Sequence, residues 1–161
     1  MRWLLGGRPQ HYQGFISARR FVVKRCGRVD ASKFQDPATN DGQKLYAVRA
    51  RGKLVYVGIT REMMSARLRL GLKPAKGQSK YRYKWRCLKG RLHLFVWVMQ
   101  PVKGRAAKKC DEQHAEAVEA EVAGLHRHLT GKWPKYQNEV HFRNKPGAAE
   151  LAAKLYAEMV E

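Results

Sequence analysis

The sequence has few acidic residues and lacks the short motifs that mark several large enzyme classes. Only 13 aspartates and glutamates stand against 33 lysines and arginines, which gives a formal net charge of +20. No GxGxxG, GxxxxGK[ST] or HExxH pattern occurs, so the sequence predicts neither a nucleotide-binding loop nor a zinc hydrolase. No apolar run approaches the roughly 18 residues that span a bilayer, which predicts no membrane partner.

Cysteine is scarce as well. The three cysteines, Cys26, Cys87 and Cys110, are odd in number and far apart, and none forms a CxxC pair. This pattern predicts neither a disulfide framework nor a structural zinc site. A reducing cytoplasm is therefore the expected location.

The positive charge is concentrated in the middle of the chain. Residues 44–104 hold 16 basic residues and one acidic residue, whereas residues 105–161 hold nine of each. A field of this strength attracts polyanions, and the middle segment is where we expect nucleic acid to bind.

Hydrophobic periodicity predicts an α+β (α/β) fold with a small three-stranded antiparallel sheet flanked by helices. Residues 1–43 are predicted to be a basic N-terminal arm, with one strand over 15–23, and residues 44–161 a single domain that includes the last helix. The predicted elements of that domain are strands at 45–50, 53–60 and 92–100, helices at 62–70, 109–129 and 146–160, and a basic loop at 71–91.

The first two strands of the domain form a hairpin around Arg51-Gly52, and this hairpin is where the chemistry is expected. Tyr46 and Tyr56 lie on adjacent strands, and alternation predicts that Leu54, Tyr56 and Gly58 share one face. A glycine on that face leaves room for a ligand to approach. The following helix carries arginines, and one guanidinium group can donate hydrogen bonds to two phosphate oxygens at once. These residue types together indicate a phosphate site, although tyrosine is also common in ordinary strands.

The chain resembles the GIY-YIG nuclease superfamily. The residues that carry the resemblance are Lys44-Leu45-Tyr46, Tyr56-Val57-Gly58, Arg67 on the next helix, Glu121 on the helix after the third strand, and the segment 130–138. Lys44 stands where the motif usually has its first glycine. The resemblance covers about residues 44–142 and leaves out the arm and the last helix.

The resemblance implies roles for individual residues. One Mg²⁺ or Mn²⁺ ion per active site would be held by Glu121, and Arg67 would contact the scissile phosphate. Tyr46, with Tyr56, would activate or orient the attacking water, and Asn138 would steady the site. The implied reaction is metal-assisted hydrolysis of a phosphodiester bond in DNA.

The choice of glutamate rests on a helical wheel. Val118, Val122, Leu125 and Leu129 define one apolar stripe, and Glu121 lies closest to it. A carboxylate at the edge of a buried stripe needs a partner, and a metal ion would supply one. Glu119 and Glu139 are the alternatives for the same role.

A second basic feature follows the arginine helix. Tyr81, Tyr83 and Trp85 alternate with cations, and alternation places these aromatic residues on one face, which is predicted to be core. The opposite face would then be a basic strip that contacts DNA. The members of this strip are Lys80, Arg82, Lys84 and Arg86.

The sequence therefore predicts a metal-dependent DNA endonuclease of the GIY-YIG type. The alternative is a non-catalytic basic nucleic-acid-binding protein that retains the fold. The sequence leaves open whether two chains pair as a homodimer to cut both strands.

Overall fold

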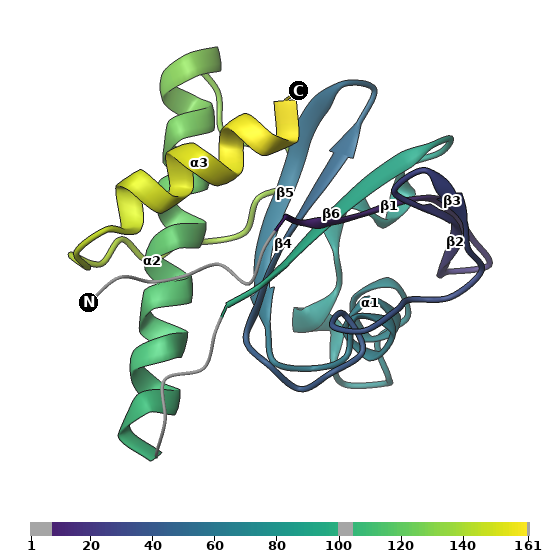
Figure 1. Cartoon of the computed structure of the whole chain (residues 1–161). Coiled ribbons are helices and arrows are strands. Elements are labelled where there is room, and N and C mark those ends of the chain that lie inside the picture. The colour runs from purple at the N-terminus through teal and green to yellow at the C-terminus, as the bar shows by residue number, and fades with distance from the viewer. Residues whose placement is uncertain (1–7, 100–104, 161) are drawn as a thin grey trace.

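Six strands and three helices make up the part of the chain that the computed structural model describes, which is residues 8–99 and 105–160 (Figure 1). The strands are β1 (Gln10–Ser17), β2 (Arg20–Cys26), β3 (Val29–Asp30), β4 (Lys44–Ala50), β5 (Lys53–Thr60) and β6 (Leu92–Val98). The helices are α1 (Met64–Leu72), α2 (Arg105–Thr130) and α3 (Ala148–Val160), and two 3₁₀ turns, η1 (Ser79–Tyr81) and η2 (Lys84–Cys87), lie between α1 and β6.

The strands form one antiparallel sheet in the order β3-β2-β1-β6-β4-β5. The predicted α+β class is confirmed, but the predicted three-stranded sheet is wrong. The three predicted strands are present as β4, β5 and β6, and β1 pairs with the free edge of β6. The sheet therefore continues across the predicted domain boundary at residue 43.

The N-terminal segment contains a hairpin in place of the single predicted strand. The predicted strand at 15–23 is interrupted at Ala18 and Arg19, which adopt φ values of 48° and 59°. Two successive residues with positive φ form the tight turn that matches the twist of a hairpin. The chain reverses there, so β1 and β2 pair side by side.

The sheet separates two hydrophobic cores, one on each face. On one face, α1 and η2 pack against the sheet through buried residues such as Leu68 and Trp85. On the other face, α2 and α3 contribute Val118 and Leu155. Figure 1 shows α2 and α3 on one side of the sheet and α1 on the other. The central strand β6 is apolar on both faces because it contributes to both cores.

The β4–β5 hairpin has the predicted turn at Arg51-Gly52 but not the predicted alternation. Val48 pairs with Tyr56, and the next pair is Arg49 with Leu54, so the strand register shifts at this point. Val55 is the extra residue of this bulge, so the side chains of β5 on the turn side of Val55 point to the face opposite to the one that simple alternation predicts. Leu54 accordingly packs in the α2–α3 core, on the opposite face from Tyr56.

None of the described helices combines the length and the apolar character that a membrane-spanning helix needs. Cys26 and Cys87 are free thiols, and no disulfide links them.

Candidate active site

Tyr46 and Gly58 face each other across the β4–β5 hairpin. The two residues are register partners. A β-carbon added to Gly58 would lie 2.8 Å from both Cζ and Oη of Tyr46, and 2.8 Å from the ring of Tyr56. Glycine is therefore the residue that lets the Tyr46 phenol lie over β5, and the opening predicted at Gly58 is filled by this phenol.

Arg67 and three tyrosines form a connected group, called here the phenol–guanidinium cluster and made up of Tyr46, Tyr56, Tyr83 and Arg67. The Nε–H of Arg67 donates to the Tyr46 hydroxyl at 3.2 Å, and the hydroxyls of Tyr46 and Tyr83 lie 2.7 Å apart. The guanidinium also lies over the Tyr83 ring, with 5.6 Å between Cζ and the ring centroid. The structure thus brings together three residues predicted for the site and adds Tyr83.

Burial controls the acidity of this cluster. Burial raises the pKa of Tyr83 and of Tyr56 well above the usual value, and the neighbouring Tyr46 phenol adds to both shifts. Burial opposes the charge on Arg67, but Tyr46 and Tyr83 favour it, so its pKa lies above the usual value. Arg67 is consequently a permanent cation, and Tyr56 and Tyr83 remain protonated near neutral pH.

A carboxyl group from the opposite layer of the fold approaches this cluster. Glu119 is a partly buried residue of α2, a helix that contacts the edge strand β5. Burial raises the pKa of the Glu119 carboxyl to about 8, the Glu116 carboxylate adds to the shift, and the Arg67 guanidinium opposes it. Glu119 also contributes to the raised pKa of Tyr56. Glu119 is therefore in electrostatic contact with two members of the cluster.

The other predicted acids lie elsewhere. Glu121 is half-buried and is two residues further along α2, about 200° around the helix from Glu119. Among the described residues, the structure records no interaction between Glu121 and the cluster. Glu139 is exposed and follows α2 in an irregular segment. The electrostatic coupling to Arg67 and Tyr56 thus favours Glu119, which is one of the alternatives from the sequence, whereas Glu121 as the metal ligand stays a prediction.

Asn138 is exposed, and within the described residues no contact to the cluster is recorded for it. The preceding residue, Gln137, attaches this segment to the sheet. Its side-chain amide accepts from the backbone N–H of Val57 and donates to the Val57 carbonyl, both at 2.9 Å. Gln137 is not identified by the sequence, because a glutamine in a loop carries no signal for such a contact.

Tyr83 is a functional candidate that the sequence predicts only as a core residue. A β-carbon at Gly71, in the last turn of α1, would lie only 2.0 to 2.5 Å from three carbons of the Tyr83 ring, and the Tyr83 N–H donates to the Gly71 carbonyl at 2.9 Å. Gly71 therefore admits the ring that brings the Tyr83 hydroxyl to Tyr46. A glycine in the last turn of a helix indicates that another group packs closely there, but the sequence does not show which group it is.

Lys44, at the position of the motif's usual first glycine, is fully buried. Its Nζ donates to the carbonyls of Asn40 and Gly42, each at 2.7 Å. Burial lowers the pKa of Lys44 to about 8, Asp41 opposes the shift, and Arg61 adds to it. The lysine thus ties the loop before β4 to the strand.

The basic strip keeps its predicted facing. Tyr83 and Trp85 are buried, as predicted, and the four cations of the strip are exposed. The side chain of Tyr81, the third aromatic residue predicted for the core, lies outside the part that the structure describes. The rings of Tyr83 and Trp85 stack with centroids 4.7 Å apart. The segment that holds Tyr83 in the cluster therefore also presents cations to solvent beside it.

The comparisons with known proteins give no match. No family model, curated protein or solved structure matches the chain. The resemblance to GIY-YIG nucleases therefore stays a hypothesis, and the geometry is the basis for a function.

We expect Gly58→Ala to lower the free energy of unfolding by about 2 kcal/mol, because the new methyl group would overlap Tyr46 and Tyr56 in a packed core. Chemical denaturation in urea measures the change. Gly124→Ala is the matched control. Its β-carbon would meet Phe142 at an ordinary distance of 3.4 Å, and alanine improves helix propensity by about 1 kcal/mol. Equal stability of the parent and Gly58→Ala would contradict the close approach of the phenols.

Proposed function

We propose that this chain is a metal-dependent DNA endonuclease that hydrolyses phosphodiester bonds. The observation that carries the proposal is the hydrogen bond of Arg67 to Tyr46, together with the contact of α2 with β5 and the electrostatic coupling of Glu119 to Arg67 and Tyr56. A fixed cation stabilises charge on a phosphate, and a carboxyl group can hold a metal ion, which are two functions that phosphodiester hydrolysis uses. The net charge of +20 supports a polyanionic substrate.

The arrangement of the elements supports a GIY-YIG type of fold for residues 44–142. Strands β5, β4 and β6 lie next to one another in that order. Helix α1, after the hairpin, carries Arg67, and α2, after β6, carries Glu119. The hairpin, the arginine helix, the third strand and the later acid thus occur in the order that the resemblance implies.

The residues present fit a hard divalent ion such as Mg²⁺ or Mn²⁺. Such ions prefer oxygen ligands, and Mg²⁺ commonly uses one or two protein carboxylates, with water and substrate phosphate as its other ligands. Glu119 would supply that carboxylate. Within the described residues no group of three His, Cys, Asp or Glu side chains is placed to hold a metal, so a site with several protein ligands is not supported. When bound, the ion would neutralise negative charge on the phosphate and acidify a coordinated water.

The side chains of the cluster have separate roles. Arg67 binds the phosphate and stabilises the charge that develops on its oxygens. Tyr56 and Tyr83 remain protonated at neutral pH, so they act as hydrogen-bond donors and not as bases. Tyr46 receives the Arg67 hydrogen bond, and this contact makes it the phenol that we assign to orienting the attacking water.

Nicking of supercoiled plasmid tests the proposal. The purified chain should convert supercoiled DNA to the open-circular form with Mg²⁺ or Mn²⁺, and EDTA should stop the conversion. Binding to the same plasmid, measured in EDTA, should remain. Binding without nicking at any metal concentration would contradict the proposed activity.

We expect nicking at a subsaturating Mg²⁺ concentration to increase with pH up to about 8. Glu119 must lose its proton to hold a cation, and burial together with Glu116 raises its pKa to that value. Added Mg²⁺ competes with the proton, so the midpoint of the profile should shift to lower pH as the metal concentration rises. The measurement is the initial nicking rate between pH 5 and pH 9. If the midpoint stays at the same pH at every metal concentration, the group that titrates is not the group that binds the metal.

The burial of the phenols favours a second function. Tyr46 is fully buried, and Tyr56 and Tyr83 are 4% and 1% exposed, respectively, so the cluster can also serve as a polar core that holds α1 on the sheet. In that case the chain would be a non-catalytic basic protein that binds nucleic acid through its exposed cations. The plasmid assay distinguishes the two functions directly.

Both functions predict that the basic strip contacts DNA. Changing Lys80, Arg82, Lys84 and Arg86 to glutamine together should weaken binding to all sequences. The slope of log K against log salt should fall by up to about 0.9 for each phosphate that the strip no longer neutralises. Fluorescence anisotropy of a labelled duplex at several salt concentrations measures the slope. An unchanged slope would show that these cations do not contact DNA.

A further inference from the structure

A cavity of about 900 Å³ lies between the β4–β5 turn, the end of α2 and the segment that follows α2. It is called here the Trp133 cavity. Among the described residues that line it there is no carboxylate, and five are cations, namely Arg51, Lys53, Lys89, Lys132 and Lys135. The cavity is thus complementary in charge to an anion, and its volume is within the range of about 300–1,000 Å³ that is usual for small-ligand sites.

Two aromatic residues line the same cavity. Trp133 is 38% exposed, and one face of its ring is covered by Arg127, whose Cζ lies 4.9 Å from the ring centroid. Tyr136 is partly buried, and its backbone N–H donates to the Val55 carbonyl at 2.9 Å. The hydrogen bond attaches this segment to β5. Cations and accessible aromatic rings in one cavity are the combination that binds phosphates and bases of a single strand.

The Trp133 cavity is connected to the candidate active site through β5. Val55 lines the cavity, and the next residue, Tyr56, belongs to the phenol–guanidinium cluster. Cys87 and Leu88 line it as well, directly after the basic strip. The cavity therefore lies beside the cluster along β5 and beside the basic strip along the chain.

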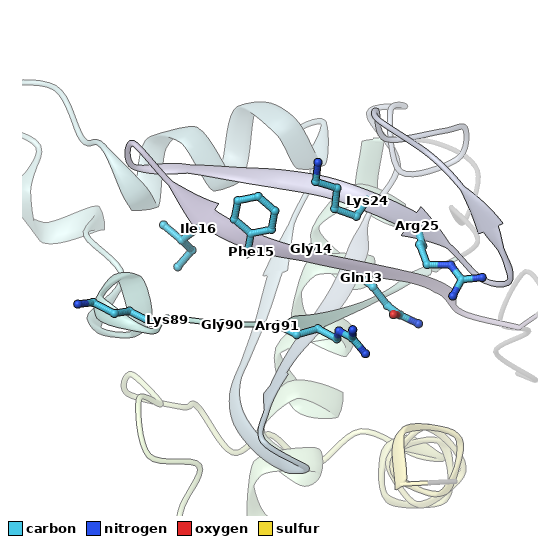
Figure 2. Close-up of a pocket in the computed structure, with 9 residues that line it drawn as sticks. All are labelled: Gln13, Gly14, Phe15, Ile16, Lys24, Arg25, Lys89, Gly90 and Arg91. Atoms are coloured by element: carbon cyan, nitrogen blue, oxygen red, sulfur yellow. The ribbon is translucent and has the colours of Figure 1, made fainter.

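A second basic cavity provides a comparison. Figure 2 shows this cavity of about 470 Å³, which is called here the Phe15 cavity and lies between the β1–β2 hairpin and the segment before β6. Its cations are Lys24, Arg25, Lys89 and Arg91, and Figure 2 shows Phe15 on β1, among the side chains that line it. Among the described residues it has no tryptophan, so the two cavities can be told apart by fluorescence.

We propose that the Trp133 cavity binds an unpaired DNA strand next to the cleavage site, with phosphates on its lysines and a base against Trp133. The proposal rests on the proposed endonuclease function and deepens it, because it makes DNA with a single-stranded segment the preferred substrate. A continuous duplex keeps its bases stacked in pairs, so it offers Trp133 no free base face. An unpaired strand offers one at each nucleotide.

Intrinsic fluorescence tests this assignment. An oligodeoxythymidine of about ten nucleotides is titrated into the full chain in EDTA, and tryptophan emission is recorded together with the anisotropy of a labelled copy of the oligonucleotide. Trp85 and Trp97 are at most 2% exposed, which makes Trp133 the accessible reporter among the described tryptophans. We expect the emission to fall on binding, and the fall to be absent in Trp133→Phe, which still binds.

Substitutions then separate the cavity from the general charge of the protein. Trp133→Ala should weaken oligonucleotide binding about tenfold, the value of a missing base–aromatic stack. Lys53→Gln with Lys135→Gln should lower the salt slope by about 0.7 for each phosphate left without its cation. Lys24→Gln with Arg91→Gln removes the same charge from the Phe15 cavity and should leave the fall in Trp133 emission in place.

Two results would overturn the assignment. One is saturation of anisotropy without any change in Trp133 emission. The other is an equal loss of affinity for Trp133→Ala and for the Phe15-cavity control, with thermal unfolding showing both variants folded. Because the titration contains no metal, its outcome does not depend on cleavage. If the oligonucleotide quenches Trp133 emission but the chain never nicks DNA, the assignment of the cavity holds and the proposed nuclease activity is contradicted. If the chain nicks DNA but no quenching occurs, the nuclease activity holds and the assignment of the cavity is contradicted.

Discussion

Arg67→Ala should lower the rate of plasmid nicking by about 100- to 1,000-fold, which is the usual cost of removing one group that stabilises charge in a transition state. The chain would still hold 32 of its 33 basic residues, so binding to DNA should change little. Tyr46 would keep its hydrogen bond to Tyr83, which limits the effect on folding. The measurements are the nicking rate at saturating Mg²⁺ and the anisotropy of a labelled duplex in EDTA.

Two variants control for the loss of charge. Arg67→Lys keeps the charge but lacks the planar donor pair of the guanidinium, so it should recover only a small part of the rate. Arg69→Ala removes an exposed cation from the same helix and should nick at nearly the parental rate. If Arg67→Ala nicks DNA at the parental rate, the cluster has only a structural role. If Arg69→Ala nicks DNA much more slowly than the parent, the phosphate contact belongs to Arg69.

Glu119→Gln should lower nicking in Mg²⁺ by about 1,000-fold, because the charge stabilisation that a bound metal supplies is worth several kcal/mol. Glutamine keeps the shape of the side chain and removes the negative charge, so binding to DNA should stay or increase slightly. Glu121→Gln is the matched control on the same helix. If Glu121→Gln is inactive and Glu119→Gln is active, the metal ligand is Glu121, as the family resemblance indicates.

Thermal unfolding gives Glu119 a readout that is independent of cleavage. Its pKa is raised to about 8 in the folded chain, so the folded state binds a proton more tightly than the unfolded state does. The resulting stability is present below the ordinary glutamate pKa and is lost as the pH rises toward 8. The melting temperature of the parent should therefore fall over this interval more than that of Glu119→Gln.

The two hairpins explain why the sequence predicts one turn and misses the other. Gly52, with a φ of 76°, supplies the conformation that a tight turn needs, and glycine is a visible signal. The β1–β2 turn uses Ala18 and Arg19, residue types that rarely adopt positive φ and carry no such signal. The sequence consequently predicts an arm where the structure has additional strands of the sheet. The bulge at Val55 is missed for a similar reason, because a register shift leaves no mark in the residue types.

The choice between Glu119 and Glu121 depends on which sides of α2 are buried, and small residues contribute to this burial as well as large ones. The helical wheel rests on valines and leucines, but Leu129 is 60% exposed and Ala115 and Ala123 are fully buried. These alanines lie four residues before and after Glu119, so they place it on a covered side of the helix. Because α2 packs against both the sheet and α3, a single apolar stripe could not identify which acid interacts with Arg67 and Tyr56.

The late position of Glu119 in the chain, on a helix that packs against the opposite face of the sheet from α1, has a consequence for synthesis of the chain. The phenols and the guanidinium are complete once residue 83 has been made, and this part of the chain carries most of the positive charge. The carboxyl group follows 36 residues later, on a helix that docks on the opposite face. A nascent chain on the ribosome would thus hold the groups proposed to bind nucleic acid before it holds the group proposed to recruit the metal. Under the proposed function, the chain would bind nucleic acid before it could cut it, and completion of the fold would be the event that allows hydrolysis.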